Sequence, residues 1–382
     1  MAIADEKYVA STTFRKTGAG ARPARLGPKM PLVSTVLIIG AGDLGERFAA
    51  GLAAVGAVRR LVLVSRTGAA EAAAMLASAH DVVVEPVACD ASRPGDVADL
   101  LTRIAPDLVV QSAAGRGPWA LAGRDDEAAR AVAAAGFALR LPYQLPVPLA
   151  VMRAVRDTGY AGPVANVSLP DVTGPVLARL GLAPAIGLGN VSMILLRARA
   201  ALRAAASDAA LPLVRVLAQH SQLSAVMQAR EPADPASRPR IWVGERPADG
   251  LAYQAPALAP SIRYNYVTAA SALPVLRALL PGAAPLRWSA PSPGGLPGGY
   301  PVRIDGGAVL LDLPPGLSRD EAVAFNERMA HGDGVARIDG DGTVNFTAAC
   351  RDAVAALDPG LAEPLSPGDL AARAALLDAA LA

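Results

Sequence analysis

Short apolar runs and longer amphipathic stretches alternate along the chain from residue 34 to about residue 168. The short β-branched runs are typical of buried strands in a parallel sheet, and the longer stretches carry the apolar spacing of helices with one buried face. We expect strands at Thr35–Ile39, Leu61–Val64, Val82–Ala88, Leu108–Gln111, Phe137–Leu141 and Val164–Val167. We expect the intervening helices at Glu46–Val55, Pro94–Ile104, Asp125–Ala135 and Pro148–Thr158, and an alanine-rich helix that Thr67 caps and that ends near His80.

This alternation predicts the fold class. Strands that alternate with helices form βαβ units, and right-handed crossovers place the helices on both faces of one sheet. The sequence therefore predicts an α/β fold with a Rossmann-like, doubly wound parallel sheet.

The pattern changes in the second half, where polar and apolar residues alternate as in a half-buried antiparallel sheet. Strands are expected at Leu213–Gln219, Arg240–Val243, Val302–Ile304, Ala308–Leu311 and Val335–Ile338, and helices at Val191–Ala206, Val267–Leu280 and Arg319–Ala330. We therefore expect a disordered tail (1–33), a nucleotide-binding Rossmann domain (34–168), an α+β substrate domain (169–345) and C-terminal helices that pack on the body (346–382). Met30 is an alternative start, so it is open whether residues 1–29 belong to the native protein.

A glycine motif, Gly40-x-Gly42-x-x-Gly45, follows the first expected strand and opens a helix. In dinucleotide-binding folds the first glycine makes a tight turn, the second lets the backbone approach a pyrophosphate, and the third lets helix and strand pack closely. The phosphates then meet the helix N-terminus. We expect cofactor contacts from the motif, including Asp43 and Leu44, although the Asp43 carboxylate must point away from the phosphates. The alternative is a tight turn that binds nothing.

The residues that end the next strands indicate which dinucleotide binds. Ser65, Arg66 and Thr67 stand where an NAD site places an acid for the ribose hydroxyl, and an arginine can instead pair with a 2′-phosphate. We therefore expect NADP(H) rather than NAD(H). Asp90 is expected either near the adenine or as a helix cap or turn acid. Ser112 and Ala113, small residues at a strand end, allow close approach of a cofactor.

Charge and lysine content exclude several classes of function. Three lysines and three arginines against two acids give residues 1–33 a charge of +4, which leaves −2 for the rest of the chain. A basic nucleic-acid face is therefore not expected. All lysines lie in that tail (Lys7, Lys16 and Lys29), so the body lacks the lysine of a P-loop, a pyridoxal phosphate site or a Tyr-x-x-x-Lys dehydrogenase site.

Cysteine and histidine are too few and too scattered for a metal site. Cys89 and Cys350 are expected as buried thiols, and the three histidines have no metal-ligand spacing. His220 follows an apolar strand in a polar cluster, so we expect it to be the catalytic proton donor; the alternative is a structural histidine. Asn190, which begins a helix, either contacts substrate or caps that helix. Asp171 is expected to cap the helix that follows Val164–Val167.

The substrate domain supplies further candidates. Arg263 and Tyr264 stand just before a helix, and Arg263 is placed to bind a carboxylate. Tyr300 and Arg303 flank the glycine- and proline-rich segment Pro291–Pro301, which is expected to be either a lid over the cleft or a plain hairpin connection. No apolar run reaches the ~20 residues of a membrane-spanning helix.

Several motifs resemble the saccharopine dehydrogenase family, in a divergent branch. They are VLIIGAGDLGER, LVLVSRT, VACDASRPGDVADLL and LVVQSAA in the first 170 residues, with NVSLPDVTGPVLARLGLAPAIGLGN, GLPGGYPV and DGTVNFT beyond them. The resemblance implies NAD(P)-dependent formation or oxidation of a C–N bond. Members that act on lysine carry a catalytic lysine–histidine pair, and the body of this chain has no lysine. Saccharopine itself is therefore not assigned as substrate.

Together these features predict an NADP-dependent oxidoreductase that reduces an imine, or oxidises an amine, of an amino-acid-like small molecule. Two alternatives stay open: a transferase of the homospermidine synthase type that uses NAD(P) catalytically, and a non-catalytic NADPH-binding protein. We expect a cytoplasmic protein without a nucleic-acid or membrane partner, and a homodimer is compatible with such a fold.

Overall fold

Six parallel strands form the central sheet of the computed structural model, which describes residues 34–56, 58–117, 119–205 and 211–382. Across the sheet the order is β3 (Val83–Ala88), β2 (Arg60–Ser65), β1 (Thr35–Ile39), β4 (Leu108–Gln111), β5 (Val164–Asn166) and β6 (Ile186–Gly187). Each neighbouring pair runs parallel. The order reverses between β1 and β4, and in such sheets ligands bind at the carboxyl ends of the strands beside that reversal.

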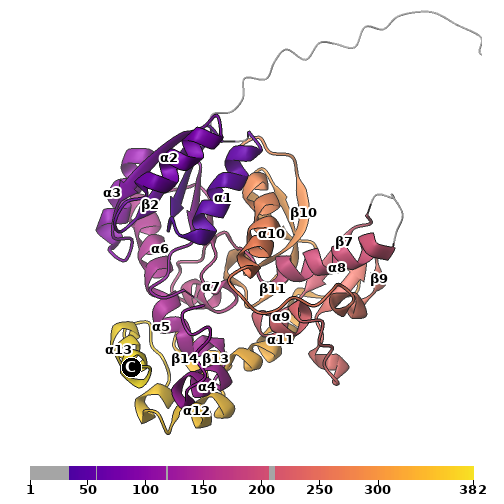
Figure 1. Cartoon of the computed structure of the whole chain (residues 1–382). Helices are drawn as coiled ribbons and strands as arrows, with labels where there is room; N and C mark the ends of the chain where they lie inside the picture. Colours follow the sequence, from indigo (N-terminus) through magenta and orange to yellow (C-terminus); the bar gives the residue numbers. More distant parts are fainter. Residues whose placement is uncertain (1–33, 57, 118, 206–210) are drawn as a thin grey trace, which may run out of the picture. The chain divides into compact units, whose positions relative to one another are not determined.

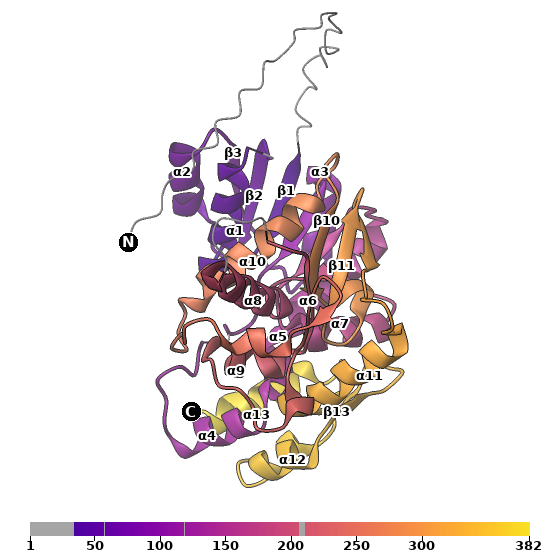
Figure 2. The same ribbon diagram turned by 90° about the vertical axis from the view of Figure 1, so that its right-hand side faces the viewer.

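Helices cover both faces of the sheet because β1 buries alternate residues on opposite sides. Val36 and Ile38 pack on α1 (Asp43–Ala54) and α2 (Ala70–Ala79), together with α10 (Tyr264–Ala278). Leu37 and Ile39 belong to the core formed with α3 (Pro94–Ile104), α6 (Pro146–Thr158) and α7 (Pro170–Arg179). Figure 1 shows α1 and α2 beside the sheet, and in Figure 2 α10 lies next to α1 and α8. The predicted doubly wound α/β fold is confirmed.

One expected strand is wrong. Phe137–Leu141 forms a 3-10 turn (η1, Phe137–Arg140) that leads into a short helix, α5 (Leu141–Gln144). Periodicity alone cannot separate a short buried strand from a buried helical segment. Pro142, in the first turn of α5, lacks the N–H that a central strand needs and suits a helix start instead.

The sheet extends beyond the domain boundary predicted at residue 168. Its sixth strand, β6, begins at Ile186, after α7. By its internal contacts the chain from Leu32 to Ala382 is one compact unit. The tail predicted at 1–33 and the predicted helix end at Ala206 lie outside the described residues.

Three smaller antiparallel sheets make up most of the second half. Their strands are β7 (Val214–Leu217), β8 (Arg240–Val243) and β9 (Arg246–Pro247); β10 (Leu286–Pro291), β11 (Gly299–Asp305) and β12 (Ala308–Leu311); and β13 (Val335–Ile338) with β14 (Val344–Phe346). The helices are α8 (Val191–Ala205), α9 (Leu223–Met227), α11 (Arg319–Ala330), α12 (Ala348–Val354) and α13 (Leu370–Ala380), with α4 (Glu127–Ala134) in the first half. A bridge between Ala218 and Gly299 joins the first two sheets.

The segment Pro291–Pro301 is not a lid. It ends β10, passes through a short 3-10 turn and starts β11, with most of its residues buried. A Cβ on Gly295 would lie 2.5 Å from the Cβ of Ala178, and a Cβ on Gly299 would lie 2.2 Å from Val191. The glycines therefore serve close packing against α7 and α8 rather than hinge motion.

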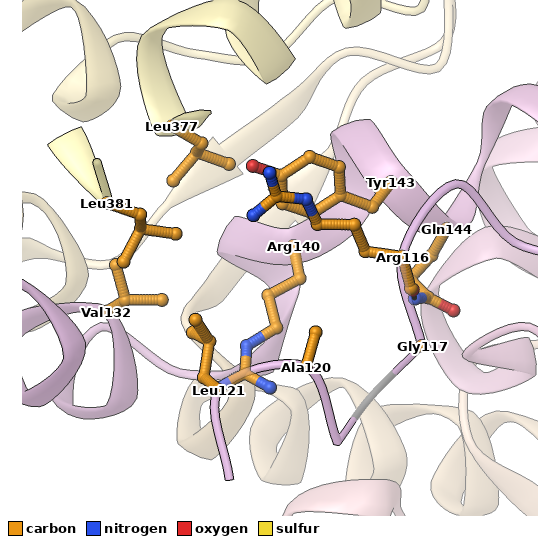
Figure 3. Close-up of a pocket in the computed structure, with 10 residues that line it drawn as sticks. All are labelled: Arg116, Gly117, Ala120, Leu121, Val132, Arg140, Tyr143, Gln144, Leu377 and Leu381. Carbon is orange, nitrogen blue, oxygen red and sulfur yellow. Dashed lines mark hydrogen bonds between the residues drawn. The ribbon is translucent and has the colours of Figure 1, made fainter. Parts of the chain in front are cut away.

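The C-terminal helix α13 packs beside α5, at the lower end of the view in Figure 1. The Tyr143 hydroxyl donates a 2.6 Å hydrogen bond to Asp378, and Arg116 forms a 2.8 Å ion pair with the same carboxylate. Figure 3 shows the Arg116 guanidinium beside the Tyr143 ring, with Leu377 and Leu381 across a small cavity. Helix α13 thus supports the chain segment that follows β4.

Candidate functional site

The glycine motif forms the turn between β1 and α1. Gly40 has φ +103°, and a Cβ there would lie 2.5 Å from the backbone nitrogen of Ala113. A Cβ on Gly45 would lie 1.9 Å from the carbonyl oxygen of Gly40, so strand and helix approach too closely for any side chain. Gly42 differs, because its φ is an ordinary −97° and a Cβ would meet nothing within 4 Å. Packing therefore explains Gly40 and Gly45, whereas Gly42 faces open space.

Asp43 does not leave an unpaired negative charge at this turn. Its carboxylate accepts hydrogen bonds of 3.0 Å from Arg47 Nε and 2.7 Å from Asn265 Nδ2. The hydrogen bond from Arg47 holds the pKa of Asp43 below its ordinary value, more strongly than partial burial raises it. Arg47 in turn lies over the Tyr266 ring, 3.8 Å from its centroid. The negative charge of Asp43 is thus paired with Arg47 of its own helix, and α10 adds the hydrogen bond from Asn265.

Arg66 follows β2 and makes no hydrogen bond or ion pair with any other residue that the structure describes. Neighbouring Ser65 donates its hydroxyl to the carbonyl of Gly68 at 2.5 Å, which closes the turn. Thr67 does not cap α2, because that helix begins only at Ala70. The guanidinium of Arg66 is therefore available to an anionic group.

The strand ends beside the turn are tied to it. Ser112 Oγ donates to the carbonyl of Gly40 at 2.7 Å, and Ser168 Oγ donates to the carbonyl of Ala113 at 2.9 Å. Asp90 accepts from the backbone N–H of Ser92 at 3.1 Å and from its hydroxyl at 2.7 Å. Asp90 does not line the cleft described below, so this geometry favours its expected alternative role as a local turn acid.

His220 is paired with an acid that lies far away in the sequence. Its Nδ1 stands 2.9 Å from Oδ1 of Asp333, a buried residue at the end of a 3-10 turn (η6, His331–Asp333). Burial alone would lower the pKa of His220, but the charge of Asp333 and its hydrogen bond outweigh burial, so the pKa lies above its ordinary value. The Phe137 ring packs against the imidazole with the centroids 4.8 Å apart.

A second buried acid, Asp171, joins His220 to Asn190. Asp171 Oδ1 accepts the backbone N–H of His220 at 3.1 Å, and Oδ2 accepts the side-chain amide of Asn190. Burial raises the pKa of Asp171 to about 6, an effect that His220 and Asn190 partly offset. The expectation that Asp171 caps a helix is wrong, because Leu169 occupies the cap of α7 and the Asp171 side chain faces these two partners instead. Asn190 itself has φ +42°.

The glycine turn and the His220–Asp333 pair open into one cleft of about 1030 Å³. Among the predicted site residues, it is lined by Gly40, Gly42, Asp43, Leu44, Gly45, Ser65, Arg66, Thr67, Ser112, Ala113, Asn190, His220 and Tyr264. The structure thus brings the expected cofactor and catalytic residues together, although their roles stay predictions.

Three expected substrate residues do not reach this cleft. Tyr300 is completely buried and donates its hydroxyl to the carbonyl of Pro297. Arg303 points outward from β11 and pairs with Asp305, and Arg263 is exposed outside the cleft lining. The expected substrate-binding role of Tyr300 is therefore corrected to a core role, and the roles of Arg303 and Arg263 have no support in this geometry.

Sequence reasoning missed Asp333 and the aromatic contact across the cleft. Trp119, in the segment after β4, meets Tyr264 edge to face with the ring centroids 5.7 Å apart. Asp333 lies 113 residues after His220, in a segment with no motif of its own. Gln144 also lines the cleft, and its amide nitrogen donates to the carbonyl of Arg116 at 2.7 Å.

Comparison with known proteins supports a nucleotide-binding domain in the first part of the chain. A family model described as the KR domain, of the NAD(P)-binding, Rossmann-like, short-chain dehydrogenase type, matches residues 34–136. The match gives no support to the resemblance to saccharopine dehydrogenases. It supports a nucleotide-dependent oxidoreductase in general terms, and it ends before the residues around His220. No curated protein matches the chain significantly.

Solved structures of similar fold include lactate dehydrogenases. The lactate dehydrogenase MGS-M5, from a Medee basin deep-sea metagenome library, is 15% identical, and the match covers 77% of this chain and 95% of that one with a TM-score of 0.46. The minor L-lactate dehydrogenase from Enterococcus mundtii is 17% identical, and the match covers 78% of this chain and 95% of that one with a TM-score of 0.46. The lactate dehydrogenase from Eimeria maxima, solved with NADH and oxamate, is 13% identical, and the match covers 79% of this chain and 91% of that one with a TM-score of 0.48. All three TM-scores are below 0.5, so no property of these enzymes is carried over to this chain.

Two further findings concern the described residues alone. None of their helices combines the length and the apolar character that crossing a membrane requires. They also contain no cluster of three or more histidine, cysteine or acidic side chains placed to hold a metal ion.

Substitution of Gly42 and of Gly45 distinguishes a role in NADPH binding from a role in packing. We expect Gly42→Ala to change the free energy of unfolding by no more than about 0.5 kcal/mol, as at an open surface position, while NADPH affinity falls at least about tenfold. Gly45→Ala should instead destabilise the fold by about 3 kcal/mol, at the upper end of ordinary single substitutions, because its Cβ overlaps Gly40. Chemical denaturation and calorimetric titration measure both. Full NADPH affinity in folded Gly42→Ala would contradict the assignment of the turn.

The pairing of His220 with Asp333 can be tested by titration. We expect His220 to lose its proton above the ordinary pKa of about 6.5, and Asp333→Asn to bring the pKa below that value, because burial is then the largest remaining influence. NMR of labelled histidine gives the pKa directly. Asp352→Asn, which removes an exposed acid on α12, serves as the control. An unchanged pKa in Asp333→Asn would show that the pair does not form in solution.

Proposed function

We propose that this protein is an NADP(H)-dependent oxidoreductase in which His220 moves the proton that accompanies hydride transfer. The observation that carries the proposal is that the glycine turn and the His220–Asp333 pair open into the same cleft. A dinucleotide bound at the turn and a substrate beside His220 share that space. The KR match over the first part of the chain supports the same class of cofactor.

The residues of the turn suit a dinucleotide. The open space at Gly42 leaves room for a pyrophosphate beside the first N–H groups of α1, whose positive end favours an anion. Arg66, with no partner in the described chain, is placed to pair with a 2′-phosphate at the end of β2. When bound, NADP(H) supplies or accepts the hydride.

His220 is equipped to exchange a proton near neutral pH. Asp333 holds Nδ1, so the other ring nitrogen, Nε2, is left to act as donor or acceptor toward a substrate. The raised pKa keeps the ring protonated in a larger part of the neutral range, which suits proton donation during reduction. Loss of that proton leaves a neutral ring whose orientation the same acid still fixes.

The proposal also specifies the kind of bond that is reduced. The resemblance to saccharopine dehydrogenases supports a C=N bond of a small molecule rather than a C=O bond. The lysine used by lysine-acting members is missing from the body of the chain, so the proton must come from another group, and His220 is the cleft residue with the most suitable chemistry.

Dinucleotide preference tests the cofactor assignment. We expect calorimetric titration to show tighter binding of NADPH than of NADH. Arg66→Gln should weaken NADPH about tenfold or more, equal to about 1.4 kcal/mol, and leave NADH nearly unchanged, because only the 2′-phosphate loses its partner. Arg153→Gln, which removes an exposed arginine on α6, should change neither affinity. Binding of neither dinucleotide would reject the proposed function. Equal loss of both in Arg66→Gln would reject the role of Arg66.

Turnover tests the role of His220. A panel of imines and ketones is assayed for loss of NADPH absorbance, and the best substrate is then used with His220→Asn. We expect turnover to fall by about 10²–10⁴-fold, the range for loss of a general acid, while NADPH affinity stays within about twofold. Unchanged turnover would show that the proton comes from elsewhere. Product formation without net NADPH loss would indicate the transferase alternative.

A further inference from the structure

The wall of the cleft around His220 offers hydrogen-bond acceptors. Asp171 accepts the Asn190 amide nitrogen, so Asn190 Oδ1, which has no hydrogen-bond partner among the described residues, remains as an acceptor in the cleft. Asp333 also lines the cleft, with its carboxylate on His220. A substrate at this position therefore meets two fixed acceptors beside the imidazole. Groups that donate hydrogen bonds are favoured there.

Carboxyl groups stand closest to His220. Asp333 lines the cleft and contacts the ring, and Asp171, which is not among the lining residues, contacts the backbone N–H of His220, so the surroundings carry a net negative charge when the ring is neutral. The positive charge of Arg140 lowers the pKa of His220, and its guanidinium stands 4.7 Å from the centroid of the Phe137 ring, but Arg140 lines the small cavity beside α13 rather than the cleft. Of the described residues that line the cleft, one is an arginine. It is Arg66, which follows β2 at the end of the cleft where we propose that the dinucleotide binds.

Aromatic and aliphatic side chains form the remainder of this wall. Phe137 covers the imidazole, and Trp119 meets Tyr264 edge to face. The aliphatic lining consists of Val167, Leu169, Leu188, Met193, Leu223 and Ile262. Aromatic faces beside carboxylates attract cations, and the aliphatic residues bind an apolar skeleton. A carboxylate on the substrate would instead meet Asp333, and the cation beside it would be a protonated His220 ring that this acid already pairs.

The geometry points to a substrate that is a cationic nitrogen compound, an iminium or amine on an apolar skeleton without a carboxylate. The inference rests on the proposed function and replaces the amino-acid-like substrate that the sequence analysis expected. In reduction the iminium carbon gains the hydride supplied by NADPH, and the C=N π pair moves to nitrogen. The neutral amine then takes the His220 proton and leaves as an ammonium ion. Oxidation runs the same steps in reverse, with His220 accepting the proton.

Three probes with one ring test this substrate class on the unchanged protein. NADP⁺ binding is measured first, because its absence rejects the proposed function rather than this inference. With NADP⁺ saturating, benzylamine (a cation at neutral pH), benzyl alcohol and benzoate are titrated in a calorimeter. We expect benzylamine to bind about tenfold more tightly than benzyl alcohol, and benzoate to bind most weakly. Benzylamine that binds no better than benzyl alcohol, or benzoate that equals benzylamine, overturns the inference even when NADP⁺ binds.

A matched pair of variants assigns the preference to the cleft acid. At a pH above the pKa of His220, where the ring is neutral in both proteins, Asp333→Asn should reduce the benzylamine affinity about tenfold and leave that of benzyl alcohol within about twofold, because only the cation loses an opposite charge. Asp352→Asn changes the net charge equally, on the exposed side of α12, and should leave the ratio of the two affinities unchanged. An equal effect of both variants would attribute the preference to net charge and overturn the inference. If Asp333→Asn does not fold, the three-probe comparison still decides.

Discussion

A single buried carboxyl group, that of Asp171, holds the His220 end of the cleft together. It lies on α7 just after β5, accepts the amide of Asn190 just after β6, and accepts the backbone N–H of His220 just after β7. The cost of burying this acid appears in its pKa of about 6, and the two donors partly offset that cost. The two donors use separate oxygens of this acid, whereas an amide would offer both of them a single oxygen. The positions of Asn190 and His220 therefore depend on one residue that does not itself line the cleft.

Local pattern was sufficient for much of the nucleotide-binding half. The bounds of β1, α3 and β4 are as predicted, because β-branched apolar runs and amphipathic spacing are properties of contiguous residues. The prediction failed where tertiary packing decides the structure. Strand β6 has only two residues, too few to show any alternation, and β10 was not expected at all; its last residue, Pro291, begins the glycine- and proline-rich segment. Those glycines are explained by close contact with α7 and α8, which the sequence does not reveal.

The candidate site likewise contains residues that the local sequence pattern predicts and residues that only the folded chain brings together. Gly40, Gly42 and Gly45 form a contiguous signal with a known steric meaning, so the turn was predictable in detail. His220 was singled out by its polar neighbours after an apolar strand, but its partner Asp333 was not, because 113 residues separate them and no pattern links the two segments. Tyr300 shows the opposite error. An aromatic residue beside a glycine-rich segment suggested a ligand contact, whereas the folded chain uses the ring as core.

The docking of α13 has a consequence for how the protein is made. Tyr143 and its hydrogen-bond partner Asp378 are separated by 235 residues, so the ribosome releases the dinucleotide turn long before the helix that supports the neighbouring segment. Domains begin to fold from the N-terminus during synthesis, and contacts between distant residues form late. The nascent chain therefore passes through a stage in which the sheet is already present but Arg116 and Tyr143 have no helix against them. Translation must pass Asp378 before this wall of the cleft acquires its final support.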